Sequence, residues 1–288
     1  MKRLIKQLRD ELDALYSQGE CDALIRIIAL DLLKIGNTTF FLRDEITLDA
    51  TQQKMLDDAI VRLKRAEPIQ YILGETEFCE LTFKVNPSVL IPRPETSELV
   101  RWIAAENSAR ENSILDIGTG SGCIAISLAK MMPQATVTAW DISPEAIETA
   151  ERNNKLNGTS VTFARQDIFA AEGEGAKYDI IVSNPPYIKE NEKEKMQRNV
   201  LDWEPCIALF VPNNDPLLFY RQIALKGTQL LKNGGRLYFE INREHGEETC
   251  NMLTQYGYTA IELRKDFADN DRMIRAILET SIPDITNE

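Results

Sequence analysis

The chain has 288 residues, of which 43% are hydrophobic and 27% charged, a balance typical of a folded globular protein. At roughly 100–200 residues per domain, this length predicts two domains. The formal net charge of −12 argues against a surface that attracts nucleic acid or anionic membrane as a whole, and the single histidine, His245, excludes a multi-histidine metal site, so no metal is expected.

Residues 1–75 are predicted to form a helical domain. Apolar side chains recur there at helical spacing in three stretches, Leu4–Leu15, Ala23–Leu32 and Leu56–Leu63. Pro68 marks the end of the last helix. We expect this domain to pack on itself, and docking of a protein substrate by it is a separate hypothesis.

Residues 76–93 are predicted to form a hairpin and linker. Apolar residues alternate loosely with polar ones at Phe78, Leu81, Phe83 and Val85, as in a short hairpin. Pro92 and Pro94 then fix an extended backbone, and Pro94 suits the first turn of a helix.

From residue 94 to residue 288, strands and helices alternate. Five strands are expected first, over residues 114–116, 137–141, 161–164, 178–183 and 236–241. A helix over residues 217–232 should end at Asn233-Gly234-Gly235. The last two strands, residues 259–263 and 273–278, have no helix between them and should pair antiparallel. This order predicts an α/β domain with a mostly parallel sheet covered by helices on both faces.

A glycine-rich loop follows the first of these strands, in the run Asp116-Ile117-Gly118-Thr119-Gly120-Ser121-Gly122. Sheets of this kind bind ligands at the carboxyl ends of their strands, so the loop indicates a ligand site. In a dinucleotide fingerprint the third glycine would fall at Cys123, and no Walker lysine follows. The pattern therefore disfavours NAD and ATP.

Acidic residues end the next two strands. Asp141 could accept hydrogen bonds from both ribose hydroxyls, and Asp167 from an adenine amino group, with Ile168 beside the ring. Each feature alone has an ordinary explanation, such as a turn glycine, a surface acid or a helix cap. Together, on three successive strand ends, they predict a nucleoside-binding site.

The fourth strand ends in Asn184-Pro185-Pro186-Tyr187. Two prolines must stop the strand and stiffen the backbone. The Asn184 side chain and the Pro185 carbonyl can both accept hydrogen bonds from a planar NH2 group, and Tyr187 can cover the flat face of that group. The alternative is a proline-stiffened loop capped by asparagine, but the neighbouring nucleoside site favours a reaction site.

These motifs resemble class I S-adenosylmethionine-dependent methyltransferases that act on planar nitrogen. Three longer stretches narrow the resemblance to the HemK/PrmC family: Gln70–Gly74, Val89–Thr96 and Ser183–Ile188. The resemblance spans nearly the whole chain. It implies a Rossmann-like fold and S-adenosylmethionine as cofactor. It also implies methylation of the N5 amide nitrogen of the glutamine in the Gly-Gly-Gln motif of class 1 peptide-chain release factors, which tunes translation termination.

The residue patterns and the resemblance together assign roles to individual positions. The catalytic set is Asn184, Pro185 and Tyr187. The cofactor set is Gly118, Thr119, Gly120, Ser121, Gly122, Asp141, Asp167, Ile168 and Asn184. The substrate set is Asn184, Pro185, Pro186, Tyr187 and Arg93. The chain departs from the usual family pattern at Ser97, Ile168, Asn242 and the loop Pro212–Pro216.

The chemistry of an amide constrains the mechanism. A primary amide nitrogen is a poor nucleophile because its lone pair is delocalised into the carbonyl, and the sequence shows no strong base near the Asn-Pro-Pro-Tyr motif. We therefore expect direct attack by the neutral amide, with Asn184 and Pro185 stabilising the positive charge that develops on nitrogen. His245 is expected to be an ordinary surface or helix-start residue.

Other functions share parts of this pattern. An adenine-N6 methyltransferase would need a basic groove for nucleic acid, but the one local cluster of cations, residues 189–198, is interleaved with glutamates. No direct nucleic-acid binding is therefore expected. Glutamine methylation of a ribosomal protein and a non-catalytic module that binds S-adenosylmethionine are further alternatives.

The cysteines bear on location. The five cysteines are scattered and lack CxxC spacing, which fits free thiols in a reducing compartment. No apolar run approaches the ~20 residues of a membrane span, and charges interrupt the N-terminal segment where a signal peptide would be apolar. We expect a cytoplasmic protein with no membrane contact.

Overall fold

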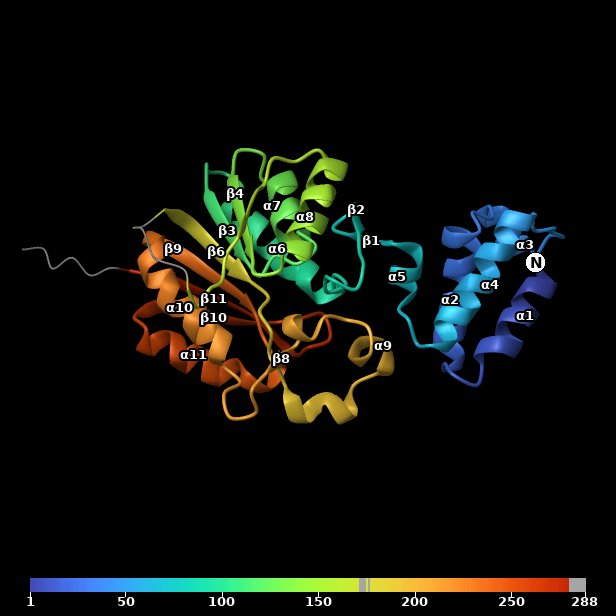
Figure 1. Cartoon of the computed structure of the whole chain (residues 1–288). Helices are drawn as coiled ribbons and strands as arrows, with labels where there is room; N and C mark the ends of the chain where they lie inside the picture. Colours follow the sequence, from blue (N-terminus) through green and yellow to red (C-terminus); the bar gives the residue numbers. More distant parts are fainter. Residues whose placement is uncertain (171–174, 176, 280–288) are drawn as a thin grey trace, which may run out of the picture. The chain divides into compact units, whose positions relative to one another are not determined.

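A computed structural model describes residues 1–170, 175 and 177–279 (Figure 1). Its contacts divide the chain into two compact units. The first comprises Met1–Glu75 together with Gln197–Trp203, and the second comprises Thr76–Met196 and Glu204–Glu288. Among the residues that the structure describes, no helix is long and apolar enough to cross a membrane.

The first unit is helical, as expected. Its elements are α1 (Lys2–Leu12), α2 (Gln18–Ile27), the π-helical turn η1 (Ile28–Leu32), α3 (Asn37–Leu42), α4 (Ala50–Lys64), α5 (Ile69–Leu73) and, from the distant segment, α9 (Arg198–Leu201). Capping boxes at Ser17 and Asp49 start α2 and α4. The apolar faces of α1, α2 and α4 meet in one core that includes Leu8, Ile28 and Leu56, all fully buried.

The hairpin of the second unit consists of β1 (Glu75–Phe78) and β2 (Leu81–Lys84). Cys79 and Glu80 form its two-residue turn with φ of 48° and 64°, as hairpin turns with both central residues left-handed require. The Phe78 and Phe83 rings pack edge to face, 6.0 Å apart, and join the core of the second unit. The hairpin is therefore an integral part of that unit.

A seven-stranded sheet forms the centre of the described part of this unit, in the order β10-β11-β9-β6-β3-β4-β5. The strands are β3 (Ser113–Ile117), β4 (Thr136–Asp141), β5 (Thr162–Arg165), β6 (Tyr178–Ser183), β9 (Leu231–Glu240), β10 (Tyr258–Lys265) and β11 (Asp271–Leu278). Neighbours from β9 to β5 run parallel, while β11 is antiparallel to both β9 and β10. The predicted sheet and its antiparallel end are confirmed.

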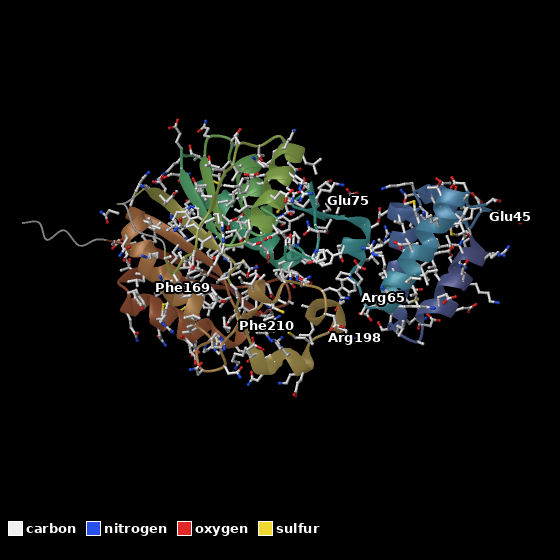
Figure 2. All side chains as sticks on the ribbon, viewed as in Figure 1. Glu45, Arg65, Glu75, Phe169, Arg198 and Phe210 are labelled. Atoms are coloured by element: carbon white, nitrogen blue, oxygen red, sulfur yellow. The ribbon has the colours of Figure 1, made fainter. Side chains whose placement is uncertain are left out.

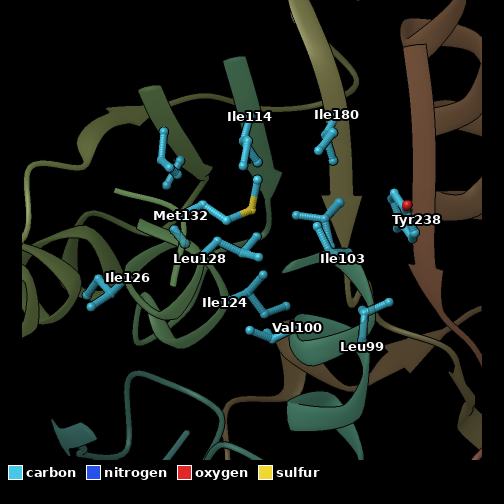
Figure 3. Close-up of a cluster of buried hydrophobic side chains, with 14 of the residues drawn as sticks. Leu99, Val100, Ile103, Ile114, Ile124, Ile126, Leu128, Met132, Ile180 and Tyr238 are labelled. Atoms are coloured by element: carbon cyan, nitrogen blue, oxygen red, sulfur yellow. The ribbon is translucent and has the colours of Figure 1, made fainter. Parts of the chain in front are cut away.

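Helices cover both faces of this sheet (Figure 1). One layer contains α6 (Pro94–Asn107), α7 (Cys123–Met131) and α8 (Pro144–Asn157), and the other contains α10 (Leu218–Leu230) and α11 (Gly246–Gln255). Successive residues of a strand point to opposite faces, so Ile180 packs with Leu99 and Ile103 of α6 (Figure 3), whereas Ile181 joins the core under α10. The central strands β3 and β6 are thus buried on both faces, which explains their continuous apolar runs in the sequence.

The predicted helix end at residue 232 is close, but the predicted start of the fifth strand at residue 236 is wrong. The helix ends at Leu230 and β9 begins at once with Leu231. Asn233, Gly234 and Gly235 form an irregularity inside the strand, where the register with β6 jumps from Tyr178↔Leu231 to Ile180↔Arg236. Gly234 has a φ of +75°, which a bulge and a helix stop both favour, so the sequence did not distinguish the two.

Short elements between β6 and α10 were not predicted. They are the strand pair β7 (Ile188–Lys189) and β8 (Phe210–Val211) and the 3-10 turns η2 (Glu190–Lys195) and η3 (Cys206–Ala208). A further 3-10 turn, η4 (Arg243–His245), precedes α11. Elements of two to six residues are too short to show a hydrophobic period. The segment after β6 matters because η3 contributes to the pocket described next.

Candidate active site

A pocket lies at the carboxyl ends of β3, β4, β5 and β6. The chain adds β4 and β5 on one side of β3 and then returns to place β6 on the other side, so the strand order reverses at this point. The loops after these four strands supply most of its lining. The predicted residues that line it are Gly118, Gly120, Asp141, Asp167, Ile168, Asn184, Pro185 and Pro186. Thr119, Ser121, Gly122, Tyr187 and Arg93 lie outside the lining.

The glycines of the loop after β3 have two different roles. Gly118 and Gly120 have φ of +75° and +54°, and a Cβ built on either would meet no atom within 4 Å. They therefore present open backbone to the pocket. At Gly122, by contrast, a Cβ would lie 2.8 Å from Ile126 Cδ1 and 3.1 Å from Ala150 Cβ. Gly122 is needed for packing between α7 and α8.

Thr119 supports the loop from inside the protein. Its hydroxyl donates to Asp116 Oδ2 at 2.6 Å, and both residues are buried. Burial raises the pKa of Asp116 to about 7, although the Thr119 hydrogen bond acts in the opposite direction. Asp116 is absent from the pocket lining, so we infer a role for this pair in holding the loop. The sequence motif includes Asp116, but its spacing alone predicts no role for this residue.

Asp141 links the glycine loop to the start of α8. Its Oδ2 accepts from the Gly120 amide at 2.8 Å and its Oδ1 from the Ser143 amide at 2.9 Å. Burial raises the pKa of Asp141, and these backbone hydrogen bonds lower it. Each carboxylate oxygen has a second lone pair, so both can also accept from a ligand hydroxyl. The carboxylate is thus prepared to bind a diol such as a ribose.

The loop after β5 gives the pocket an apolar wall. Asp167 Oδ1 accepts from the Phe169 amide at 2.9 Å, and Ile168 between them is buried. Phe169 (Figure 2) packs edge to face on Phe219 of α10, with ring centroids 5.4 Å apart, and both rings line the pocket. These two phenylalanines were missed. They supply aromatic surface next to Ile168.

Asn184 is held in place by neighbouring elements. The preceding Ser183 hydroxyl donates to the Ile117 carbonyl at 2.6 Å and ties the end of β6 to β3. Asn184 Nδ2 donates to Thr96 Oγ1 at 3.4 Å, and Thr96 Oγ1 in turn donates to Glu240 Oε2 at 2.6 Å. The Asn184 carboxamide therefore lines the pocket while its amino group is bound from behind.

One buried carboxyl lies close to the motif, although the sequence shows no strong base there. The Glu240 carboxyl, at the end of β9, is separated from Asn184 by a single hydroxyl group. Glu240 is 2% exposed, and burial raises its pKa to about 7, against the lowering effect of Thr96, Arg272 and Asn184. Glu240 is absent from the pocket lining, so it does not face the ligand space.

Tyr187 and Arg93 do not line the pocket and instead contact neighbouring residues. Tyr187 packs against the core under α10, and its carbonyl accepts from Asn242 Nδ2 at 3.3 Å. Arg93 pairs with the buried Glu204 at 2.6 Å. Glu204 immediately precedes Pro205, which lines the pocket. The ion pair therefore ties the Pro-Arg-Pro segment to the segment that leads into Pro205.

His245 lies outside the pocket lining. It sits in η4, 9% exposed, with Nδ1 2.7 Å from Glu248 Oε2. This contact, three residues along the chain, places the imidazole at the start of α11. The structure gives it no access to the ligand space.

Comparisons with known proteins match both parts of the chain. Residues 3–74 match the family model of the PrmC N-terminal domain, and residues 95–202 match that of the methyltransferase small domain. The release factor glutamine methyltransferase of Bacteroides thetaiotaomicron is 50% identical over 277 residues, covering 96% of this chain and 99% of that protein. Its counterpart in Flavobacterium psychrophilum is 45% identical, covering 94% and 98%. That of Streptococcus pneumoniae is 41% identical, covering 91% and 94%.

Proposed function

Because the chain belongs to the release factor glutamine methyltransferase family, we propose that it methylates the N5 amide nitrogen of the glutamine in the Gly-Gly-Gln motif of a class 1 peptide-chain release factor. The enzyme is an S-adenosylmethionine-dependent protein-glutamine methyltransferase. One observation carries the proposal: Asn184, Pro185 and Pro186 line the same pocket as the open glycine loop and Asp141. The Asn-Pro-Pro segment, which can accept hydrogen bonds from a planar NH2 group, thus borders a site that suits a nucleoside.

The residues present fit S-adenosylmethionine. Gly118 and Gly120 leave their pocket faces free of side chains, and both Asp141 oxygens keep a lone pair for ribose hydroxyls. Ile168 and Phe169 offer apolar surface for an adenine ring, with Asp167 nearby as an acceptor. When bound, S-adenosylmethionine supplies an electrophilic methyl group on a sulfonium.

The Asn-Pro-Pro turn would hold the substrate amide. Asn184 Oδ1 and the Pro185 carbonyl accept its two N–H bonds and keep the nitrogen aimed at the methyl donor. Both acceptors favour the positive charge that develops on the nitrogen during attack, and correct alignment alone can contribute about 7–11 kcal/mol. The methylated nitrogen then gives up one of its protons to solvent water, which restores the neutral amide. Tyr187 and Arg93 support the turn and the pocket wall, so we assign them an indirect part in substrate binding.

The helical unit would dock the protein substrate. Its α3 helix leaves Phe41 and Leu42 largely exposed, 62% and 69%, which suits contact with another protein. We further propose that the enzyme works in the cytoplasm, since its five cysteines are free thiols and its substrate acts in translation.

Transfer of labelled methyl groups tests this function. The full chain is incubated with methyl-labelled S-adenosylmethionine and a purified class 1 release factor, in parallel with ribosomal proteins and with DNA. We expect label in the release factor, and none when its Gly-Gly-Gln glutamine is replaced by alanine. Label in ribosomal protein or nucleic acid alone would replace the proposal by one of those alternatives.

A further inference from the structure

Three side chains from distant parts of the sequence form a buried chain behind the pocket. Glu240 ends β9, Thr96 lies in the first turn of α6, and Asn184 follows β6. Thr96 and Glu240 are each 2% exposed, with Thr96 Oγ1 2.6 Å from Glu240 Oε2. Asn184 Nδ2 lies 3.4 Å from the same Thr96 oxygen. The first two residues do not line the pocket, but the third does.

The chemistry of these groups gives the chain a direction. An ionised carboxylate can only accept hydrogen bonds, so the single hydroxyl proton of Thr96 must point to Glu240. The Thr96 oxygen then has only lone pairs to offer. Asn184 must therefore present Nδ2, its donor, to Thr96, because Oδ1 in that place would face another acceptor. A planar carboxamide held in this way has its oxygen on the side away from Thr96.

We propose that Glu240 and Thr96 are positioning residues that fix which way the Asn184 carboxamide faces. This inference rests on the proposed function, because Asn184 Oδ1 is the atom that accepts from the substrate amide. A reversed carboxamide would present an N–H donor to the substrate N–H and repel it. Neither Glu240 nor Thr96 lines the pocket, so neither reaches the substrate proton as a direct base would have to.

The charged groups around Glu240 set its ionisation. The positive charge of Arg272 in β11 favours the Glu240 carboxylate, whereas the negative charge of Glu95 in α6 disfavours it. The Glu240 charge also acts on the Tyr187 hydroxyl and raises the pKa of that group. Arg272 is shared with Asp266, 3.0 Å away, so it neutralises Glu240 only in part. Burial raises the pKa of Glu240 to about 7. A protonated Glu240 carboxyl can donate a hydrogen bond to Thr96 Oγ1. The Thr96 hydroxyl can then donate to Asn184, and this arrangement favours the reversed carboxamide, with Oδ1 toward Thr96. The chain orients Asn184 correctly only when Glu240 is ionised.

A pair of substitutions at Thr96 tests the hydroxyl. Thr96→Val keeps the shape and removes the hydrogen-bonding group, so we expect kcat to fall about tenfold, less than for loss of the preorganised group itself. Thr96→Ser keeps the hydroxyl and should recover most of that loss. The Kd for S-adenosylmethionine, from calorimetry, should stay constant in both. Equal rates for the valine and serine variants would overturn the proposal.

A matched control separates this effect from general disturbance of the fold. Glu106 accepts hydrogen bonds from Trp102 and Tyr238 and pairs with Arg275, away from the pocket lining. We expect the methylation rate of wild type to fall as the pH drops through about 7. Glu106→Gln should show the same fall, whereas in Glu240→Gln the rate should no longer depend on pH in this range. The same fall of the rate at low pH in Glu240→Gln would contradict the role of that carboxyl.

A spectroscopic readout works without turnover. In 15N-labelled full-length protein, the Asn184 side-chain NH2 signals, assigned by their loss in Asn184→Ala, should shift with pH as Glu240 titrates. The shift should vanish in Thr96→Val and in Glu240→Gln. Signals that titrate equally in all three proteins would sink the proposal. If the wild type fails to methylate release factors, the proposed function fails, while this titration still decides the orientation of Asn184.

Discussion

At the scale of single residues, the sequence identified several of the groups that face the ligand space, but it missed Phe169 and Phe219 in the lining and the residues that hold Asn184. Gly118, Asp141 and Asn184 could be predicted because each follows a strand, and parallel strands end at one edge of a sheet. Thr96 and Glu240 lie 88 residues before and 56 residues after Asn184, so no local pattern connects them to it. Burial and pairing of this kind become visible only when the chain is folded.

Asn184 itself should govern the chemical step. Replacing it by alanine removes a preorganised acceptor, so we expect kcat to fall by ~10²-fold or more. The Kd for S-adenosylmethionine should change little, because Asp141 and the glycine loop remain. Steady-state kinetics with a release factor, together with calorimetry, separate the two quantities. Turnover within about threefold of wild type would contradict the assignment.

Asp141 should behave in the opposite way. Asp141→Ala removes the acceptor for a ribose and also the bonds to the Gly120 and Ser143 amides. We expect the affinity for S-adenosylmethionine to fall by about tenfold or more, since hydrogen bonds to a charged acceptor contribute about 1.5–3 kcal/mol each. Calorimetric titration measures this directly. An unchanged Kd would remove Asp141 from the cofactor site.

At the scale of elements, alternation of strands and helices was enough to predict the sheet, its parallel core and its antiparallel end. The prediction failed where one signal serves two structures. Asn233-Gly234-Gly235 reads as a helix stop, yet in the fold it forms an irregularity inside β9. The two-residue strands β7 and β8 were also missed, because pairing of Ile188 with Phe210 is a tertiary contact with no local period.

Alanine substitutions in the glycine loop can separate a role in packing from a role in ligand binding. Both Gly118→Ala and Gly122→Ala place a side chain at positive φ, which costs about 1–2 kcal/mol. Only Gly122→Ala also forces a Cβ to within 2.8 Å of Ile126. We expect chemical denaturation to show the lower free energy of unfolding for Gly122→Ala. If Gly118→Ala were the less stable variant, the two roles assigned to these glycines would be reversed.

At the scale of the whole molecule, two buried carboxyls of the described chain connect function to stability. Burial raises the pKa of Asp116 and of Glu240 to about 7, well above their ordinary values of 3.8 and 4.5. These two carboxyls therefore bind more protons in the folded protein than in the unfolded chain between those limits. Their contribution to the free energy of unfolding falls as the pH rises through this window. An enzyme that keeps Glu240 ionised for orientation thus gives up some stability at neutral pH.

This trade-off can be measured by comparing Glu240→Gln with wild type. Glutamine keeps the shape but does not ionise, so the variant escapes the loss of stability that Glu240 causes above its ordinary pKa. We expect the Tm of the variant minus that of wild type to be larger at about pH 8 than at about pH 5. A difference that stays constant with pH would show that Glu240 titrates alike in the folded and unfolded states.

If the pocket transfers a methyl group to one glutamine side chain of a release factor, tandem mass spectrometry of the release factor after reaction with the full chain and S-adenosylmethionine will locate that group. We expect one added methyl group, on the side-chain nitrogen of the Gly-Gly-Gln glutamine, and transfer slower by ~10²-fold or more with Asn184→Ala. A methyl group on any other residue, or its transfer by Asn184→Ala at the rate of wild type, would show that this pocket does not act as proposed.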